Sequence, residues 1–244
     1  MKRIIALLLF CLIFASCAND SDIASTTTAP QDTTKAPETT SLPETTVPET
    51  DEPKAALKII NDYLLPLESY SWEREYAPEY VVIHFTSAVV NHRDDPYNMA
   101  YIRQTFTDYG VSINYIIDRD GTVYCYIPEE RAAWHAGKGT LSAGEKYTNA
   151  LNKYSIGIEL VGMGSASDMS QYLTEKEYAA LDRSLIGFTD AQYTSLSLLV
   201  DDICTRYGIE KDREHIIGHE DYSPAKTDPG ELFDWGKILN GETK

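Results

Sequence analysis

The segment from residue 18 to 54 constrains the fold of this chain most. It contains the run TTTAPQDTTKAPETTSLPETTVPETDEP and almost no apolar side chains. Such a segment cannot bury enough apolar surface to offset the entropy of folding, so we predict a disordered, extended tether. Folding is therefore confined to residues 55–244, which is enough chain for one domain with a hydrophobic core.

The first 17 residues, MKRIIALLLFCLIFASC, have the pattern of a secretory signal. Lys2 and Arg3 precede an apolar run that is too short for a membrane span and ends in small residues. A small pair followed by Cys17 resembles a bacterial lipobox, which predicts lipidation of Cys17 and a lipid anchor to the membrane. The alternative is an ordinary signal peptide with a chance cysteine, because Phe14 is unusual three positions earlier. The protein would then be secreted.

The net charge of −17 makes the chain a poor partner for nucleic acid. Anionic lipid would also repel the folded part unless a covalent anchor held it at the membrane. Only Cys125 and Cys204 lie beyond the predicted signal and lipidation site, and their pairing cannot be read from one sequence. We expect an extracytoplasmic monomer that faces the cell wall.

Strand patterns alternate with helix patterns after the tether, which predicts an α/β fold with a mixed central β-sheet flanked by helices. Helical spacing occurs at residues 55–67, 97–109 and 188–208, with Gly110 and Gly208 as helix ends. Strand patterns occur at residues 79–85, 155–162 and 215–219, and the pair Asp120-Gly121 indicates a hairpin. The polar stretch 162–185 is interpreted as an insertion that contains a helical piece.

The run SIGIELVG is a strand with one unusual side chain. Its alternation directs Ile156, Ile158 and Leu160 to one face and Gly157 with Glu159 to the other. A carboxylate on an otherwise small and apolar strand is costly to bury unless it is paired or used. From spacing alone, Glu159 could be a salt-bridge partner or a general base.

The run HEDYSPAKTDPG places His219, Lys226 and Asp228 within ten positions, with prolines that restrain the loop. His84 and His219 both lie at predicted strand ends, so they could converge over the edge of the sheet with Asp228 and hold Zn²⁺. Lys226 beside a metal ligand would be useful for stabilising an oxyanion. By spacing alone, isolated structural or surface histidines remain an alternative.

Several motifs in one order resemble those of the type-2 N-acetylmuramoyl-L-alanine amidase family. The family includes AmpD-like enzymes and is related to phage amidase-type lysozymes and peptidoglycan recognition proteins. The motifs are VVIHFT, VSINYIIDRDGTVY, RAAWHAG, NKYSIGIEL, FTDAQY and IIGHEDYSPAKTDPG, and they extend over residues 80–230. The resemblance implies a zinc site at the sheet edge in an open groove, within an amidase domain at residues 55–244.

The resemblance also implies roles for individual residues. The implied zinc ligands are His84, His219 and Asp228, the implied general base is Glu159, and the implied oxyanion stabiliser is Lys226. His135 of WHAG and Asn114 match positions that we take as candidate substrate contacts, and a structural role for His135 is equally open. The implied reaction is zinc-dependent hydrolysis of the amide between N-acetylmuramic acid and L-alanine in peptidoglycan or muropeptides.

Two departures and two alternatives accompany this interpretation. Ile113 occupies a position where phage and recognition-protein relatives have a tyrosine, which puts a tyrosine-assisted mechanism in doubt. The insertion at 162–185 exceeds the usual connection and leaves specificity open. One alternative function is an inactive peptidoglycan-binding lipoprotein of the same fold. The other is a cysteine peptidase, which the positions of Cys125 and Cys204 disfavour, because neither lies at a helix start.

Overall fold

The computed structural model describes residues 57–239. The predicted signal at 1–17, the lipidation site Cys17 and the tether at 18–54 lie outside these residues, so they stay predictions. No helix within the described range is long and apolar enough to span a bilayer.

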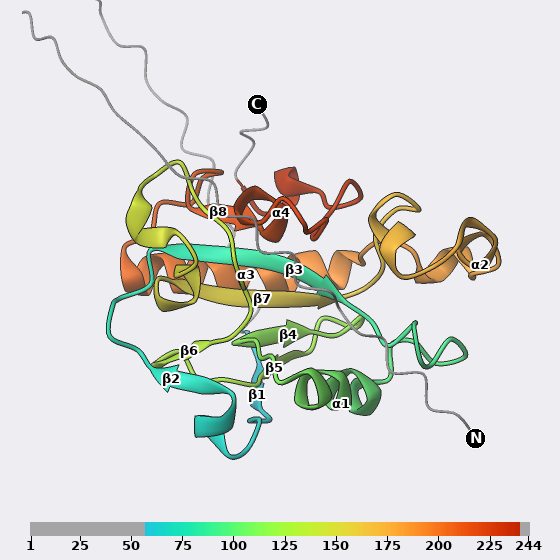
Figure 1. Ribbon diagram of the computed structural model, residues 1–244, viewed down its shortest axis with the longest axis horizontal. Coiled ribbons are helices and arrows are strands. Elements are labelled where there is room, and N and C mark those ends of the chain that lie inside the picture. The colour runs from blue at the N-terminus through green and yellow to red at the C-terminus, as the bar shows by residue number, and fades with distance from the viewer. Residues whose placement is uncertain (1–56, 240–244) are drawn as a thin grey trace, which may run out of the picture. The chain divides into compact units, whose positions relative to one another are not determined.

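A six-stranded mixed sheet forms the centre of the described domain, in the order β1-β5-β4-β7-β3-β8 (Figure 1). Only the β4–β5 pair is antiparallel; the other neighbours run parallel. Its strands are β1 (Ile59–Asn61), β3 (Tyr80–Thr86), β4 (Tyr115–Ile117), β5 (Val123–Cys125), β7 (Ser155–Val161) and β8 (Ile216–Gly218). The separate pair of β2 (Ser71–Glu73) and β6 (Arg131–Ala133) is antiparallel. The predicted mixed α/β sheet is confirmed.

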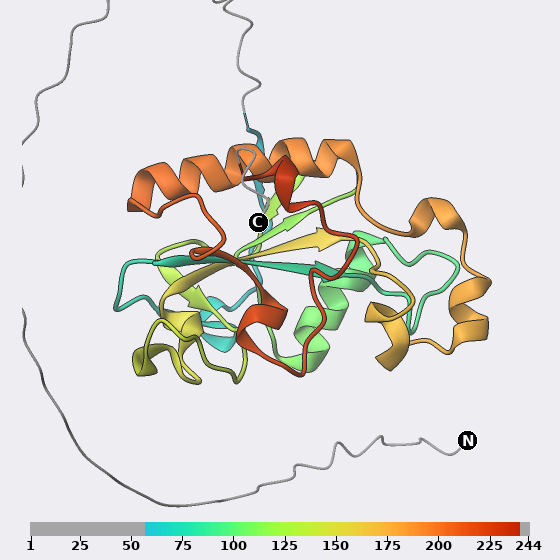
Figure 2. The same ribbon diagram turned by 90° about the horizontal axis from the view of Figure 1, so that it is seen from above.

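Helices cover both faces of the sheet, as the view in Figure 2 shows. They are α1 (Met99–Tyr109), α2 (Glu175–Ala179), α3 (Asp190–Tyr207) and α4 (His219–Tyr222). The long helix α3 packs on one face, where its buried residues join Val81, Ile83, Ile156 and Ile158 in one apolar cluster. On the opposite face α1 lies over β4, while α4 and the segment between β6 and β7 lie over β3 and β8.

The predicted ends of α1 and α3 are confirmed by their backbone geometry. Gly110 and Gly208 follow these helices with φ angles of 63° and 68°, in the left-handed region that glycine adopts without steric cost. Thr189 caps α3 and forms a reciprocal capping box with Gln192. Both helices therefore begin or end where the sequence signals them.

The helix predicted at residues 55–67 is wrong for the described part of that range. Ile59–Asn61 forms strand β1 parallel to β5, and Leu64 continues the pairing through its N–H to the Tyr126 carbonyl at 3.0 Å. A short apolar run fits both a helical and a strand period. Here the free edge of β5 supplied backbone partners that an isolated segment does not have.

Candidate functional site

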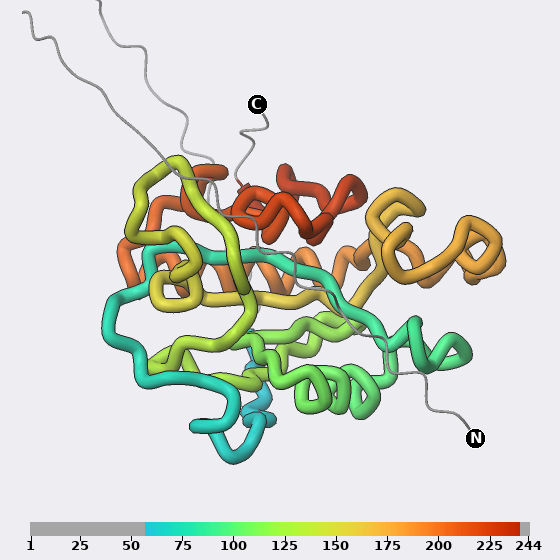
Figure 3. The backbone as a smooth tube through the Cα atoms, viewed as in Figure 1, coloured from blue at the N-terminus to red at the C-terminus, as the bar shows by residue number. Residues whose placement is uncertain are grey.

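The candidate site begins with two neighbouring strands whose register places His84 directly opposite Glu159. Both residues are on the face that α4 covers, because the alternating positions Ile83 and Ile158 belong to the α3 side. The two strands lie side by side along their whole length (Figure 3). The site therefore lies over one face of the sheet, toward the carboxyl ends of β3 and β7.

His219 and Asp228 complete a compact cluster with His84. His219 is the first residue of α4, and Asp228 lies in the loop that follows this helix. The Nδ1 atoms of His84 and His219 are 3.1 Å apart, and both approach Asp228 Oδ2, at 2.8 and 3.0 Å. Both histidines are buried and the aspartate is 16% exposed. The fold thus brings His84 to two predicted ligands far along the chain, and the three residues direct one atom each toward a common point.

The hydrogen bonds behind these histidines determine where their protons lie. His219 Nε2 is 3.0 Å from the Ala136 carbonyl, which can only accept, so Nε2 carries the proton and Nδ1 a lone pair. Ser155 Oγ donates to the Leu151 carbonyl at 2.8 Å and lies 3.1 Å from His135 Nε2. His135 then donates from Nε2 to Ser155.

The contact between His135 and His84 determines which ring nitrogen of His84 carries the proton. His135 Nδ1, left without a proton, is 3.0 Å from His84 Nε2, which therefore donates to it. Burial and the neighbouring His219 lower the pKa of His84 to about 4, so its ring is neutral and carries this single proton. His84 Nδ1 therefore carries a lone pair, as His219 Nδ1 does.

This arrangement tests whether the residues fit a metal ion. Two imidazole lone pairs and a carboxylate oxygen converge within about 3 Å, and these groups repel each other without a cation between them. Two nitrogens, one carboxylate oxygen and proton-donating rings held from behind are the donor set and outer support of a catalytic zinc site. The described residues therefore fit Zn²⁺, with His84, His219 and Asp228 as the groups that would hold it.

Glu159 lies beside this cluster in an unusual state. Its Oε2 atom is buried and has no hydrogen-bond partner in the described structure. Burial, and to a lesser extent the charge of Asp228, raises the pKa of Glu159 well above its ordinary value, while Lys226 opposes the shift. An unpaired carboxyl group whose pKa is raised in this way can serve as a proton acceptor and donor.

Lys226 belongs to the same loop as Asp228 and is exposed to solvent. Its backbone N–H donates to the Ser223 carbonyl at 2.9 Å, which shapes the turn after α4. The positive charge is close enough to lower the pKa values of both Glu159 and His84. The structure therefore brings Lys226 to the site that contains the two histidines.

Asn114, a candidate substrate contact from the sequence, is fully buried in the structure. Its side chain has no exposed surface; its amide nitrogen donates to the Ile127 carbonyl at 3.1 Å and its oxygen accepts from Gly157 N–H at 3.1 Å. These bonds join the residue before β4 to Gly157 within β7 and to Ile127 just after β5. Asn114 is therefore a buried structural residue, whereas His135 is partly exposed and its ring nitrogens contact His84 and Ser155.

The remaining histidines and the cysteines do not join the cluster. His92 stacks on Tyr101 with ring centroids 3.7 Å apart, and His215 Nδ1 is 2.8 Å from Asp212. Cys125 and Cys204 are buried and free, and burial raises their pKa values to about 12 and about 11. Thiols of this kind are poor nucleophiles, which disfavours the cysteine-peptidase alternative.

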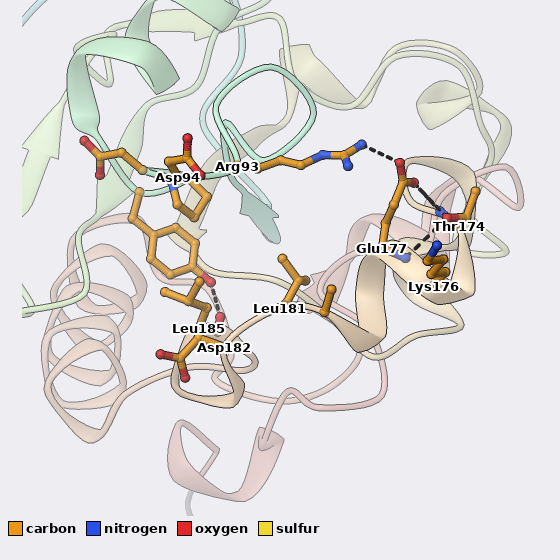
Figure 4. Close-up of a pocket in the computed structure, with 12 residues that line it drawn as sticks. Arg93, Asp94, Thr174, Lys176, Glu177, Leu181, Asp182 and Leu185 are labelled. Atoms are coloured by element: carbon orange, nitrogen blue, oxygen red, sulfur yellow. Dashed lines mark hydrogen bonds and ion pairs between the residues drawn. The ribbon is translucent and has the colours of Figure 1, made fainter.

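A pocket of about 820 Å³ lies beside the insertion, between it and the loop after β3 (Figure 4). Arg93 and Glu177 form an ion pair at 2.7 Å along its wall, and Leu181 and Leu185 contribute apolar surface. None of the predicted catalytic or metal-binding residues lines it.

Sequence reasoning missed Ser155, which directs the proton of His135. One signal was available, because Ser155, Gly157 and Glu159 share a face of the strand in SIGIEL. Gly157 is also required at its position, since a Cβ atom there would lie 2.7 Å from the His135 ring. The packing that makes Ser155 important brings together segments about 20 residues apart.

Comparison with known proteins identifies relatives for most of the described domain. Residues 74–231 match the model of a family described as N-acetylmuramoyl-L-alanine amidase. The 1,6-anhydro-N-acetylmuramyl-L-alanine amidase AmpD of Enterobacter cloacae is 36% identical over 129 residues, which cover 52% of this chain and 55% of AmpD. AmpD of Citrobacter freundii is 28% identical over 191 residues, covering 77% and 81% of the two chains. This chain thus spans about half of the first relative and four fifths of the second.

Two solved structures are also similar. A selenomethionine derivative of AmpD has a TM-score of 0.49 at 27% identity, with 71% of this chain and 90% of that chain covered. Escherichia coli AmiD, in complex with the substrate anhydro-N-acetylmuramic acid-L-Ala-D-gamma-Glu-L-Lys, has a TM-score of 0.48 at 28% identity, with 67% and 57% covered.

Proposed function

Because the chain belongs to the N-acetylmuramoyl-L-alanine amidase family, a family of hydrolases, we propose that it hydrolyses the amide between N-acetylmuramic acid and L-alanine in peptidoglycan or its fragments. The AmpD relatives are named for substrates whose N-acetylmuramyl sugar is in the 1,6-anhydro form, so anhydro-muropeptides are the first substrates to test. The observation that carries the proposal is the cluster of His84, His219 and Asp228 directly beside the unpaired Glu159.

Zinc dependence is part of the proposal. The two imidazole nitrogens and Asp228 Oδ2 support it, because they form a donor set that suits a divalent cation. Zinc, when bound, polarises water and the scissile carbonyl. His135, Ser155 and the Ala136 carbonyl hold the two histidines in the tautomers that binding requires.

The protein groups have separate tasks in this mechanism. Glu159 takes the proton of the attacking water and returns it to the leaving amine of L-alanine. Lys226 supplies positive charge where the carbonyl oxygen becomes negative, which stabilises the transition state more than the ground state. The mechanism needs no tyrosine at position 113, in agreement with the isoleucine found there.

We further propose that the enzyme is a monomer that acts outside the cytoplasm, held at the membrane by lipid on Cys17. Support comes from the N-terminal sequence pattern, with its basic start, apolar run and small residues before Cys17. The inactive wall-binding alternative would require a missing ligand or base, and each matching position contains the expected residue type.

One experiment tests the proposed activity. The full chain is incubated with peptidoglycan and with an anhydro-muropeptide, with chelator and then with restored zinc, and products are identified by mass spectrometry. We expect peptides that begin with L-alanine, lost on chelation and recovered with zinc. Binding to the wall by the folded, zinc-loaded protein without such peptides would favour the inactive alternative.

A further inference from the structure

The insertion between β7 and α3 contacts the loop that contains Lys226 and Asp228. This insertion includes a short 3-10 helix, η4 (Asp168–Gln171), whose first residue Asp168 is buried, with 5% exposure. Asp168 Oδ2 accepts from Ser165 N–H at 2.8 Å within the insertion and from Glu231 N–H at 3.3 Å at the end of the 226–231 loop. In return, Thr227 Oγ1 donates to the Asp168 carbonyl at 3.1 Å. One buried residue thus bonds the loop on both sides of Asp228.

Two glycines allow this close approach. A Cβ atom at Gly230 would lie 2.5 Å from Asp168 Oδ2, and Gly230 has a φ angle of 77°. A Cβ atom at Gly164 would lie 2.7 Å from the same oxygen. The carboxylate therefore fits between two backbone segments that larger residues would separate.

Part of the insertion is packed against the rest of the domain. Met169 and Leu173 of the insertion are buried in a small apolar cluster with Val89 and Met163. Its base is closed by a backbone bond from Gly187 N–H to the Met163 carbonyl at 2.8 Å. Asp168 is therefore anchored in packed structure rather than in a free loop.

The same short helix also approaches the reacting groups. Tyr172 follows η4 and is half exposed, and its pKa is raised by burial and by the negative charges of Asp228 and Glu159. Because Thr227 and Glu231 on either side of Asp228 both bond Asp168, the insertion lies beside the candidate site.

We propose that Asp168 is a positioning residue, through which the insertion holds the 226–231 loop so that Asp228 and Lys226 keep their places at the site. The catalytic importance of Asp168 rests on the proposed function, but its hydrogen bonds to the 226–231 loop do not depend on catalysis. It assigns the insertion a role in metal affinity that its polar sequence alone does not indicate.

The test compares three variants of the full chain by amide hydrogen exchange and by zinc affinity in a competition titration. Asp168→Ala removes both carboxylate bonds, so we expect faster exchange in peptides covering residues 226–231 and about tenfold weaker zinc binding. Asp168→Asn should retain both properties, because one amide oxygen can accept both N–H groups. Asp182→Ala is the matched control, since Asp182 accepts from Ser184 N–H in the same insertion without reaching the loop.

Each outcome decides the proposal. Unchanged exchange and affinity in Asp168→Ala would overturn it, and so would an equal effect of Asp182→Ala, which would indicate general loosening of the insertion. If Asp168→Ala fails to fold, Thr227→Val, which removes only the hydroxyl bond, must still raise local exchange, and no change there would reject the proposal. Loss of protection in a protein that hydrolyses no muropeptide would leave this inference intact and reject only the proposed function.

Discussion

The two faces of β7 differ although they belong to the same seven residues. One face presents Ile156, Ile158 and Leu160 to α3, all fully buried in an apolar cluster. The other presents Ser155, which directs a proton, Gly157, which leaves space for a ring, and Glu159, which has an unpaired oxygen. Because side chains alternate along a strand, one face of β7 contributes packing energy and the other contributes the groups of the candidate site. Substitutions on the two faces should therefore have different effects.

The largest effect is expected from Glu159→Gln, which preserves shape and removes the proton acceptor. Muropeptide hydrolysis should fall about 10²–10⁴-fold, the range for loss of a general acid–base group. Zinc content and the free energy of unfolding should change little, because the amide matches the carboxyl group in size and shape. Activity close to that of the unchanged protein would remove Glu159 from the base role.

The opposite face should respond in stability instead. Ile158→Ala leaves a cavity against α3, and we expect the free energy of unfolding to fall by about 2–5 kcal/mol. Denaturant unfolding measures this change, while zinc affinity of the folded fraction, measured by titration, should remain. A variant that is fully stable but binds zinc poorly would contradict the division between the two faces.

The buried carboxylate Glu129 has partners that Glu159 lacks, which sharpens the comparison. Glu129 accepts hydrogen bonds from Tyr115 and Tyr207 and forms an ion pair with Arg206. Burial would raise its pKa, but the bonds from Arg206 and the two tyrosines outweigh this and lower it. Glu129→Gln should therefore cost about 1–3 kcal/mol of unfolding free energy at pH 7.

The pH dependence of this variant has a definite sign. A folded pKa below the unfolded value contributes stability above the unfolded pKa of about 4.3, and this contribution is lost as the pH falls through the folded pKa. The stability difference between the unchanged protein and Glu129→Gln should thus shrink in acid. Denaturant midpoints at several pH values measure it, and a difference that grows in acid would contradict the assigned shift.

The smallest effect, on zinc affinity, is expected from Ser155→Ala, which acts on His84 through the hydrogen bonds of His135. The variant removes the acceptor for His135 Nε2–H, so the His84 tautomer is no longer imposed. Zinc affinity should fall about tenfold, the lower end for an outer hydrogen-bond partner. Thr205→Ala, which removes an exposed hydroxyl on α3, is the matched control and should have no effect.

Local patterns predicted much of the fold because the forces concerned act over a few residues. Gly110 and Gly208 end their helices through their own backbone conformation. The alternation in SIGIELVG predicts the two faces of β7 without reference to a partner strand. The prediction at 55–67 was wrong because β1 depends on β5, about 60 residues away.

The candidate site divides in the same way. From the sequence by itself came the residue types and the resemblance that singled out His84, His219, Asp228, Glu159 and Lys226. Tertiary structure alone decided that Asn114 is buried, that His135 and Ser155 set a tautomer, and that Asp168 bonds the 226–231 loop. The physical reason is that hydrogen-bond direction and burial depend on atoms brought within about 3 Å by folding, and sequence spacing does not determine which distant atoms meet.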